Sequence, residues 1–229
     1  MNIDANLIQR IALFLPAILV SLTVHEYAHA WVATKLGDDT PTRQGRLTFS
    51  PLAHIDLFGT VIFPLMLLAT TGGFFGWAKP VQFNPHNFTR RFSMRQGAAL
   101  TAVAGPASNI LLALIALIAM RVLIEMGVMG GASEDTSSIV FKFISALVPL
   151  NVLLAVFNIL PLPPLDGSYL LPRSMDQLRA WLERYSMIIF LLVFLLPIPG
   201  LGSTLGGYII RPLMVLTSTL LTSIVFWGL

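Results

Sequence analysis

The chain contains no cysteine, and this absence excludes a large class of sites. Disulfide bonds, thiolate nucleophiles, iron–sulfur clusters and cysteine-based zinc sites all require a residue that none of the 229 positions supplies. Any metal must therefore be held by His, Asp or Glu side chains. The chain also has no long basic run and no basic surface interleaved with aromatic residues, so we do not expect it to bind nucleic acid.

Charged residues are also scarce. They make up only 11% of the chain, against about 25% in an average soluble domain. Hydrophobic residues make up 55%, and the mean hydropathy is +0.79. So few charges cannot cover the surface of a water-soluble globule, and the chain is too apolar to be disordered. The composition predicts an all-α integral membrane protein with one bundle of helices.

Six apolar blocks are separated by charged and turn-forming residues. A helix needs about 20 residues to cross the hydrocarbon core. Four blocks meet this length, the fifth meets it if it begins near Trp181, and the second is too short. We therefore expect about five to six transmembrane helices. The blocks cover about residues 7–36, 57–71, 97–128, 139–162, 185–196 and 208–229.

The loops between the blocks predict how the chain is oriented in the membrane. Several Lys or Arg residues occur in three loops, at residues 35–55, 73–95 and 166–184. The loop at 129–138 contains neither, so the positive-inside rule places it outside and the other three in the cytoplasm. Both loops around the short block 57–71 then lie on one side. We expect this block to be a re-entrant hairpin; the alternative is a short span kinked by Pro64.

The first block contains the pattern H-E-x-x-H, formed by His25, Glu26, Tyr27, Ala28 and His29. On a helix, residues four apart lie on one face, so both imidazoles can reach one metal ion. The glutamate lies about 100° further around the helix, where it can contact a metal-bound water. The alternative is a cluster of paired polar side chains that binds no metal.

A catalytic zinc usually has three protein ligands and an open position for water. His54, His86 and the Asp residues are candidates for the third ligand, and Asp166 stands out among them. It follows a proline-rich break at the inner end of the fourth block, and irregular backbone at membrane depth tends to line a cavity. Its alternative role is an ordinary Asp-Gly turn. Asp166 shares the cytoplasmic half with the two histidines only if block 57–71 does not cross the membrane.

The paired motifs resemble those of the site-2 protease family (M50-type), which are intramembrane zinc metalloproteases. The second motif, N-x-x-P-x-x-x-x-D-G, runs from Asn158 to Gly167. The resemblance implies that His25, His29 and Asp166 bind one zinc ion per chain. It further implies that Glu26 is the catalytic base, that Asn158 is a catalytic residue that steadies the substrate or the oxyanion, and that the substrate is a transmembrane segment of another protein.

Three further stretches add to the resemblance: one is similar to a segment of the whole family, and two resemble a compact bacterial branch without a PDZ or CBS domain. The family segment is G-P-x-x-N at residues 105–109, and the stretches of the compact branch are residues 50–56 and 76–81. We expect a single membrane-embedded domain over residues 1–229, with a catalytic core at about 7–172 and a closing helical hairpin at about 181–229. The expected location is the bacterial cytoplasmic membrane, as a multi-pass protein with the active site toward the cytoplasmic half. The sequence leaves the oligomeric state open.

Two local features allow alternatives. Residues 46–50 alternate polar and apolar side chains, which predicts a short β-strand that holds an unwound substrate by backbone pairing; the alternative is a plain loop. His54 either approaches the metal, as a fourth ligand or an oxyanion partner, or caps the hairpin and pairs with Asp56. At the level of function, the competing hypotheses are a membrane carrier that conducts metal or protons through buried His, Glu and Asp, and a binding protein that keeps the fold without cleaving.

Overall fold

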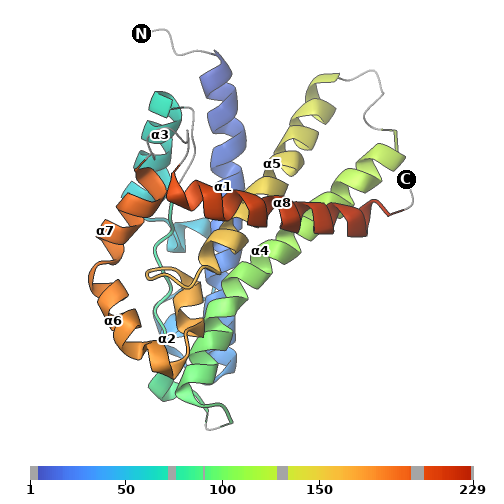
Figure 1. Cartoon of the computed structure of the whole chain (residues 1–229). Coiled ribbons are helices and arrows are strands. Elements are labelled where there is room, and N and C mark those ends of the chain that lie inside the picture. Colours follow the sequence, from blue (N-terminus) through green and yellow to red (C-terminus); the bar gives the residue numbers. More distant parts are fainter. Residues whose placement is uncertain (1–4, 72–75, 90, 128–133, 197–203, 228–229) are drawn as a thin grey trace.

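The computed structural model describes residues 5–71, 76–89, 91–127, 134–196 and 204–227 (Figure 1). In these ranges the regular elements are all helices, joined by turns and irregular segments, and there is no β-sheet. Four of its helices are long and apolar enough to cross a membrane, which confirms a membrane protein built of helices. They are α1 (Ala5–Lys35), α4 (Met94–Glu125), α5 (Glu134–Asn158) and α8 (Leu205–Val225).

Helices α1, α4 and α5 pack against one another and form the centre of the molecule (Figure 1). Alanines such as Ala17, Ala113 and Ala116 are almost completely buried between them. Small side chains at these positions let helix backbones approach closely, which is how helices in a membrane gain packing contacts. Helix α4 begins with a capping box in which Ser93 and Gln96 satisfy each other's backbone amides.

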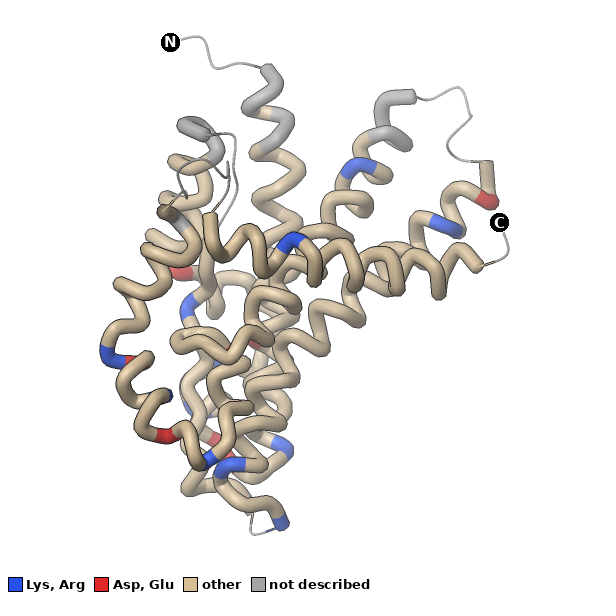
Figure 2. The backbone as a smooth tube through the Cα atoms, in the orientation of Figure 1, with Lys and Arg blue, Asp and Glu red and all other residues tan. Residues whose placement is uncertain are grey.

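The connection from α1 to α4 leaves the lower end of α1 and returns to it (Figure 1). It contains α2 (Thr40–Arg43), η1 (Pro51–Ala53), η2 (Leu57–Ile62), α3 (Phe63–Thr71) and η3 (Pro85–Asn87). The Thr89 amide donates to the Leu36 carbonyl at 2.7 Å, so the end of the connection lies beside its beginning. Figure 2 shows Lys and Arg gathered around the lower ends of α1 and α4 and around α6.

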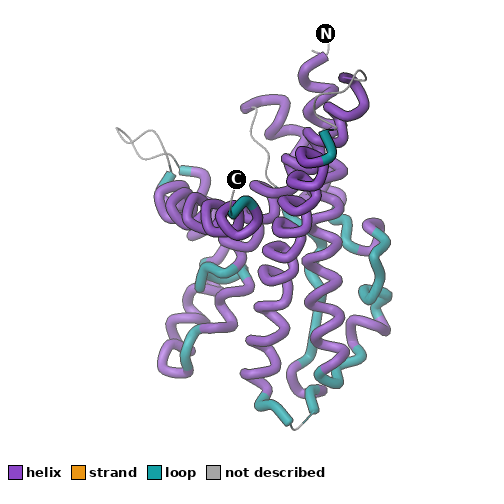
Figure 3. Tube along the Cα trace, turned by 90° about the vertical axis from the view of Figure 1, so that its right-hand side faces the viewer, coloured by secondary structure: helices purple, strands orange, loops and turns teal. Residues whose placement is uncertain are grey.

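After α5 the chain forms short helical pieces before α8. These are η5 (Asp166–Leu170), η6 (Arg173–Met175), α6 (Asp176–Arg184), α7 (Ser186–Phe190) and η7 (Leu191–Leu195). The turn at Tyr185 separates α6 from α7, so the helix of the fifth apolar block does not extend back to Trp181. Helix α8 crosses α4 and α5 at a steep angle: it lies transverse to α1 in Figure 1 and is seen nearly end-on in Figure 3.

The β-strand expected at residues 46–50 is wrong. These residues form bends and irregular backbone, and no described segment pairs with them as a neighbouring strand. Local side chains take the hydrogen bonds that a strand would need: the Thr48 carbonyl bonds to Nε2 of His54, and the Ser50 amide donates to Oγ1 of Thr48. A five-residue alternation is too short to exclude such a loop.

Candidate metal centre

Two imidazoles meet on the inner face of α1. His25 and His29 lie one turn apart, are 4% and 6% exposed, and their Nε2 atoms are 3.0 Å apart. Their rings stand almost perpendicular, with an interplanar angle of 85°. The i, i+4 spacing therefore does what the sequence predicts and turns two nitrogen atoms toward one point.

Asp166 completes this cluster from a distant part of the chain. It is the first residue of η5, and its Oδ2 lies 3.1 Å from Nε2 of His25 and 3.3 Å from Nε2 of His29. One ligand atom from each of the three residues lies within 4.8 Å of the other two. Among the described residues this is the only such group, and it joins the three side chains that the sequence predicts as ligands.

Hydrogen bonds to the Nδ1 atoms of the two imidazoles leave their Nε2 atoms free to bind a cation. Nδ1 of His29 lies 2.7 Å from the Thr101 carbonyl, which can only accept, so this nitrogen carries the hydrogen. Nδ1 of His25 lies 2.6 Å from Oδ1 of Asn109. Both Nε2 atoms then turn lone pairs toward Oδ2 of Asp166, a buried oxygen with no hydrogen-bond partner. Three lone pairs that face one point fit a cation, and two imidazoles with one carboxylate are ligands that zinc accepts.

Two glycines make room for this cluster. A Cβ on Gly105 would lie 2.6 Å from Nε2 of His25 and would also collide with Nε2 of His29. A Cβ on Gly167 would collide with the carbonyl oxygens of Ile159 and Leu160, at the end of α5. The first glycine admits the imidazoles against α4, and the second lets the Asp166 backbone approach the end of α5. Each lies in a motif that the sequence singles out.

Glu26 is buried beside the cluster and is held by a backbone amide. The Val81 amide donates to its Oε2 at 2.8 Å, and the residue is 7% exposed. Its other oxygen, Oε1, has no hydrogen bond from the described part of the chain. One carboxylate oxygen is thus fixed by a donor, and the other is available for chemistry.

Val81 belongs to an extended segment, residues 77–82, that runs alongside α1. Three alternate amides of this segment point inward: that of Trp77 donates to the Gly59 carbonyl at 3.0 Å, that of Lys79 to the His54 carbonyl at 2.9 Å, and that of Val81 to Glu26. The amides of Ala78 and Gln82 have no hydrogen-bond acceptor among the described residues, and Pro80 between them has no amide hydrogen. Residues 77–82 therefore make hydrogen bonds along one edge next to the cluster, and their other edge is free of partners from the described residues.

Asp38 fixes the lower end of this segment. Its carboxylate accepts hydrogen bonds from the Asn84 amide at 2.6 Å, from Nδ2 of Asn87 at 2.8 Å and from Oγ1 of Thr40 at 2.6 Å. Burial by itself would raise the pKa of the Asp38 carboxyl, but these donors together hold that pKa below its ordinary value. The ionised carboxylate therefore ties the end of α1 to the segment that reaches Glu26.

Other residues singled out in the sequence lie outside the metal cluster. Nδ2 of Asn158 donates to the Leu154 carbonyl of its own helix at 2.9 Å. His54 is 2% exposed, and its Nε2 bonds to the Thr48 carbonyl, so it packs inside the connection. Asp56 caps η2 by accepting from the Gly59 amide. His86 lies exposed in η3.

Sequence reasoning gave no role to several groups around the cluster. The Val81 amide has no side-chain pattern by which it can be recognised. Asn109 and Asn151, by contrast, are amides inside apolar spans, and polar residues at such depth are costly unless they serve a purpose. The presence of two amide side chains in apolar helices was therefore the feature of the sequence that could have pointed to a role for them.

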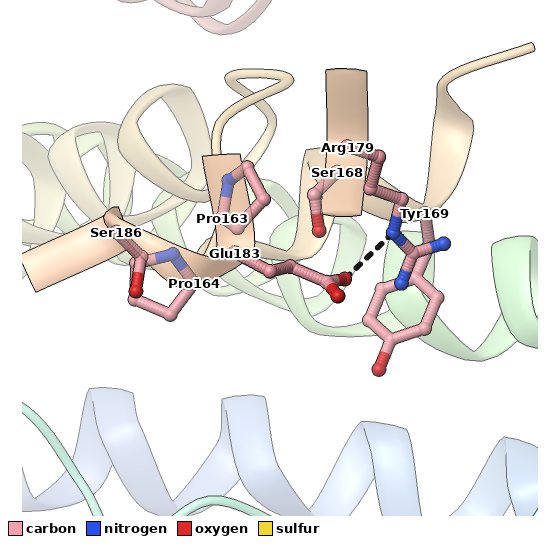
Figure 4. Close-up of a pocket in the computed structure, with 7 residues that line it drawn as sticks. All are labelled: Pro163, Pro164, Ser168, Tyr169, Arg179, Glu183 and Ser186. Atoms are coloured by element: carbon pink, nitrogen blue, oxygen red, sulfur yellow. Dashed lines mark hydrogen bonds and ion pairs between the residues drawn. The ribbon is translucent and has the colours of Figure 1, made fainter. Parts of the chain in front are cut away.

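An open pocket of about 320 Å³ lies between the loop that carries Asp166 and helix α6 (Figure 4). Ser168, two residues after Asp166, lines it and is 2% exposed. The guanidinium of Arg179 lies 4.5 Å from the centre of the Tyr169 ring and bonds to Glu183 at 2.8 Å. The pocket thus brings polar and charged groups close to the Asp166 loop. The remaining lining residues are Pro163, Pro164 and Ser186.

Comparisons with known proteins point in one direction. A family model described as "Peptidase family M50" matches residues 13–141. The chain is 38% identical over 201 residues to "Putative zinc metalloprotease YwhC" of Bacillus subtilis, covering 86% of this chain and 83% of that one. It is 31% identical to "Putative zinc metalloprotease Rip2" of Mycolicibacterium smegmatis, over 65% of this chain and 52% of that one. It is 29% identical to the protein of the same name from Mycobacterium tuberculosis, over 83% of this chain and 67% of that one. No solved structure matches the chain.

Proposed function

The chain belongs to peptidase family M50, and from this premise we propose that it is an intramembrane zinc metalloprotease. It hydrolyses a peptide bond within or near a transmembrane segment of another membrane protein. One observation carries the proposal: two imidazoles of α1 and a carboxylate more than a hundred residues later turn their lone pairs to a single point beside a buried glutamate. No observation favours the carrier hypothesis.

In this proposal His25, His29 and Asp166 hold one zinc ion per chain. A zinc ion held by these three residues would supply Lewis-acid chemistry, namely activation of water at neutral pH and polarisation of a carbonyl. Oε1 of Glu26 accepts the proton that the attacking water loses and then delivers it to the leaving amine. The Val81 amide keeps Oε2 in place during both transfers, so that Oε1 faces the reacting atoms.

Asn158 is proposed as a partner of the oxyanion or of the substrate. Its Nδ2 is engaged by the Leu154 carbonyl, so it must leave that bond to donate elsewhere. Its place at the end of α5, eight residues before Asp166, supports a role near the reaction without assigning a contact.

A helical substrate hides its amides in its own hydrogen bonds and must unwind before it can be cleaved. The free edge of residues 77–82 offers an unwound segment backbone partners beside Glu26. Backbone pairing of this kind binds an extended peptide with little dependence on its sequence. We therefore assign to this segment the role that the sequence suggested for residues 46–50.

Water must reach the site from outside the lipid. The pocket between the Asp166 loop and α6, lined by Ser168, Arg179 and Glu183, is polar and open, and we propose that it is the route for water (Figure 4). The basic residues around the lower ends of α1 and α4 support an orientation with this end in the cytoplasm (Figure 2). The expected location is the bacterial cytoplasmic membrane.

The proposed architecture is a single membrane-embedded domain over residues 1–229. Its catalytic core covers about residues 7–172, and residues 181–229 close it from one side. The bonds from the Thr89 amide to Leu36 and from the Asn84 amide to Asp38 support a re-entrant course for the η2–α3 region, because they bring both ends of the connection together.

The test uses the full chain, purified in detergent, with a panel of tagged single-span membrane proteins as substrates. Glu26→Gln is expected to abolish cleavage while zinc content stays at one per chain, because the glutamate is not a ligand. Asp166→Ala is expected to lose both zinc and cleavage. Full cleavage by Glu26→Gln, or metal flux in liposomes that survives this substitution, would overturn the proposal.

A further inference from the structure

A chain of buried polar side chains lies behind His25 and connects three helices. Ser21 of α1, Asn109 of α4 and Asn151 of α5 are each 0% exposed. The proteolytic chemistry requires neither Ser21 nor Asn151, since neither touches the metal cluster. Burial of three polar side chains in an apolar bundle calls for a reason.

The orientation of the Asn109 amide is determined by its partners. Its Nδ2 lies 3.2 Å from the Ser21 carbonyl and 2.7 Å from Oδ1 of Asn151, so both of its hydrogens have acceptors. A backbone carbonyl cannot donate, and a flipped amide would place two oxygens against each other. Oδ1 of Asn109 therefore faces His25.

The orientation of Asn151 is determined in the same way. Its Nδ2 donates to the Leu147 carbonyl at 2.8 Å and to Oγ of Ser21 at 2.9 Å. The Ser21 hydroxyl donates in turn to the Ala17 carbonyl at 2.7 Å, so its oxygen is free to accept. Backbone carbonyls thus end the chain of hydrogen bonds on α1 and on α5, and every bond between them has one allowed direction.

We propose that Asn109, held by Asn151 and Ser21, is a positioning residue that determines the tautomer and the ring orientation of His25. Because Oδ1 of Asn109 only accepts, Nδ1 of His25 carries the hydrogen, and the Nε2 lone pair points to the metal position. The inference rests on the proposed role of His25 as a zinc ligand. It also means that α5 influences the metal site through Asn151, which contacts Asn109 but none of the three proposed ligands.

His29 gives an internal comparison within the same site. Its Nδ1 donates directly to the Thr101 carbonyl, which needs no supporting side chains to define its direction. The two ligands are therefore oriented by different means, one by backbone and one by side chains. Substitutions in the side-chain relay should disturb His25 and leave His29 as it is.

The experiment measures zinc affinity by competition with a chromogenic chelator, and the tautomers of histidine by ¹⁵N NMR of the full chain in micelles. The chain has only 4 His, which keeps the spectrum assignable. Asn109→Leu is expected to weaken zinc binding by about 10- to 100-fold, the range for loss of a partner that orients a ligand. Asn151→Leu should weaken it several-fold, and both should alter the Nδ1–H resonance of His25 but not that of His29.

Two serines provide a matched pair that keeps the test valid if a leucine variant does not fold. Ser21→Ala removes one oxygen from the relay, whereas Ser145→Ala removes an exposed hydroxyl that bonds only to its own helix. Ser21→Ala should shift the His25 resonance, and Ser145→Ala should not. An unchanged His25 resonance in Ser21→Ala, or zinc affinity within twofold of wild type in folded Asn109→Leu, overturns the proposal.

Failure of the relay is distinguishable from failure of the proposed function. His25→Ala must lose zinc if His25 is a ligand at all. Loss of zinc in His25→Ala together with wild-type binding in Asn109→Leu overturns the relay alone. Retention of zinc in His25→Ala overturns the metal site itself.

Discussion

Substitution of Gly105 by alanine tests the packing of the metal site against α4. The added Cβ would lie 2.6 Å from both Nε2 and Cε1 of His25, whereas ordinary van der Waals contact begins near 3.4 Å. All three of its nearest neighbours are imidazole atoms, so the strain falls on the ligands and not on the helix backbone. The His25 ring must retreat by about 0.8 Å, well beyond the roughly 0.2 Å that a metal–ligand distance tolerates.

We expect Gly105→Ala to weaken zinc binding about a hundredfold, or about 2.8 kcal/mol. Helix content should stay near that of wild type, whereas the metal-free protein should melt lower, because the added Cβ overpacks the buried imidazoles and such strain typically costs about 1–3 kcal/mol. The measurements are chelator competition for zinc, circular dichroism and thermal unfolding in detergent. Ala107→Val, which adds bulk to the exposed face of α4 two residues later, serves as the control.

Zinc affinity within twofold of wild type in folded Gly105→Ala would refute this reasoning. It would mean that the imidazoles do not meet the metal in the position that α4 imposes on them. Equal loss in Ala107→Val would also contradict it, because the effect would then not depend on the contact with His25.

Three further predictions concern the surroundings of the site. Val81→Pro removes the amide hydrogen that fixes Oε2 of Glu26, so turnover should fall at least tenfold with zinc content unchanged; equal turnover would contradict the role of this amide. Gly167→Ala should lower zinc affinity, because its Cβ collides with carbonyls at the end of α5 and displaces Asp166; metal analysis of the purified variant checks this. Asp38 has a lowered pKa, so it stabilises the fold above about pH 4 and loses this effect as pH falls through the lowered value; Asp38→Asn should therefore melt lower at pH 7 and show a flatter dependence on acid, measured by thermal unfolding from pH 7 downward.

The metal cluster could be predicted from the sequence because its ligands lie in local patterns. His25 and His29 need only the geometry of one helix to meet. Asp166 needs a topology as well, and the loop charges supplied it by placing the 166–184 loop on the same side as the end of α1. The structure brings these three residues together as that reasoning requires.

The parts that sequence reasoning missed depend on backbone groups and on partners far away in the chain. The Val81 amide looks like any other amide until residues 77–82 lie against α1. The error at residues 46–50 has the same origin: alternation in five residues does not reveal that His54 will bond to the Thr48 carbonyl. The break at Tyr185 lies where the charged residues Glu183 and Arg184 meet the fifth apolar block, and composition alone does not tell whether a helix continues across such a boundary.

The three-helix relay behind His25 has a consequence for the newly made chain. A nascent protein that has inserted only α1 contains both histidines but lacks Asn109, Asn151 and Asp166, which are synthesised later. The proposed zinc site can therefore form only after α4 and α5 have docked against α1. Assembly of the cluster is therefore coupled to folding of the three-helix bundle as a whole.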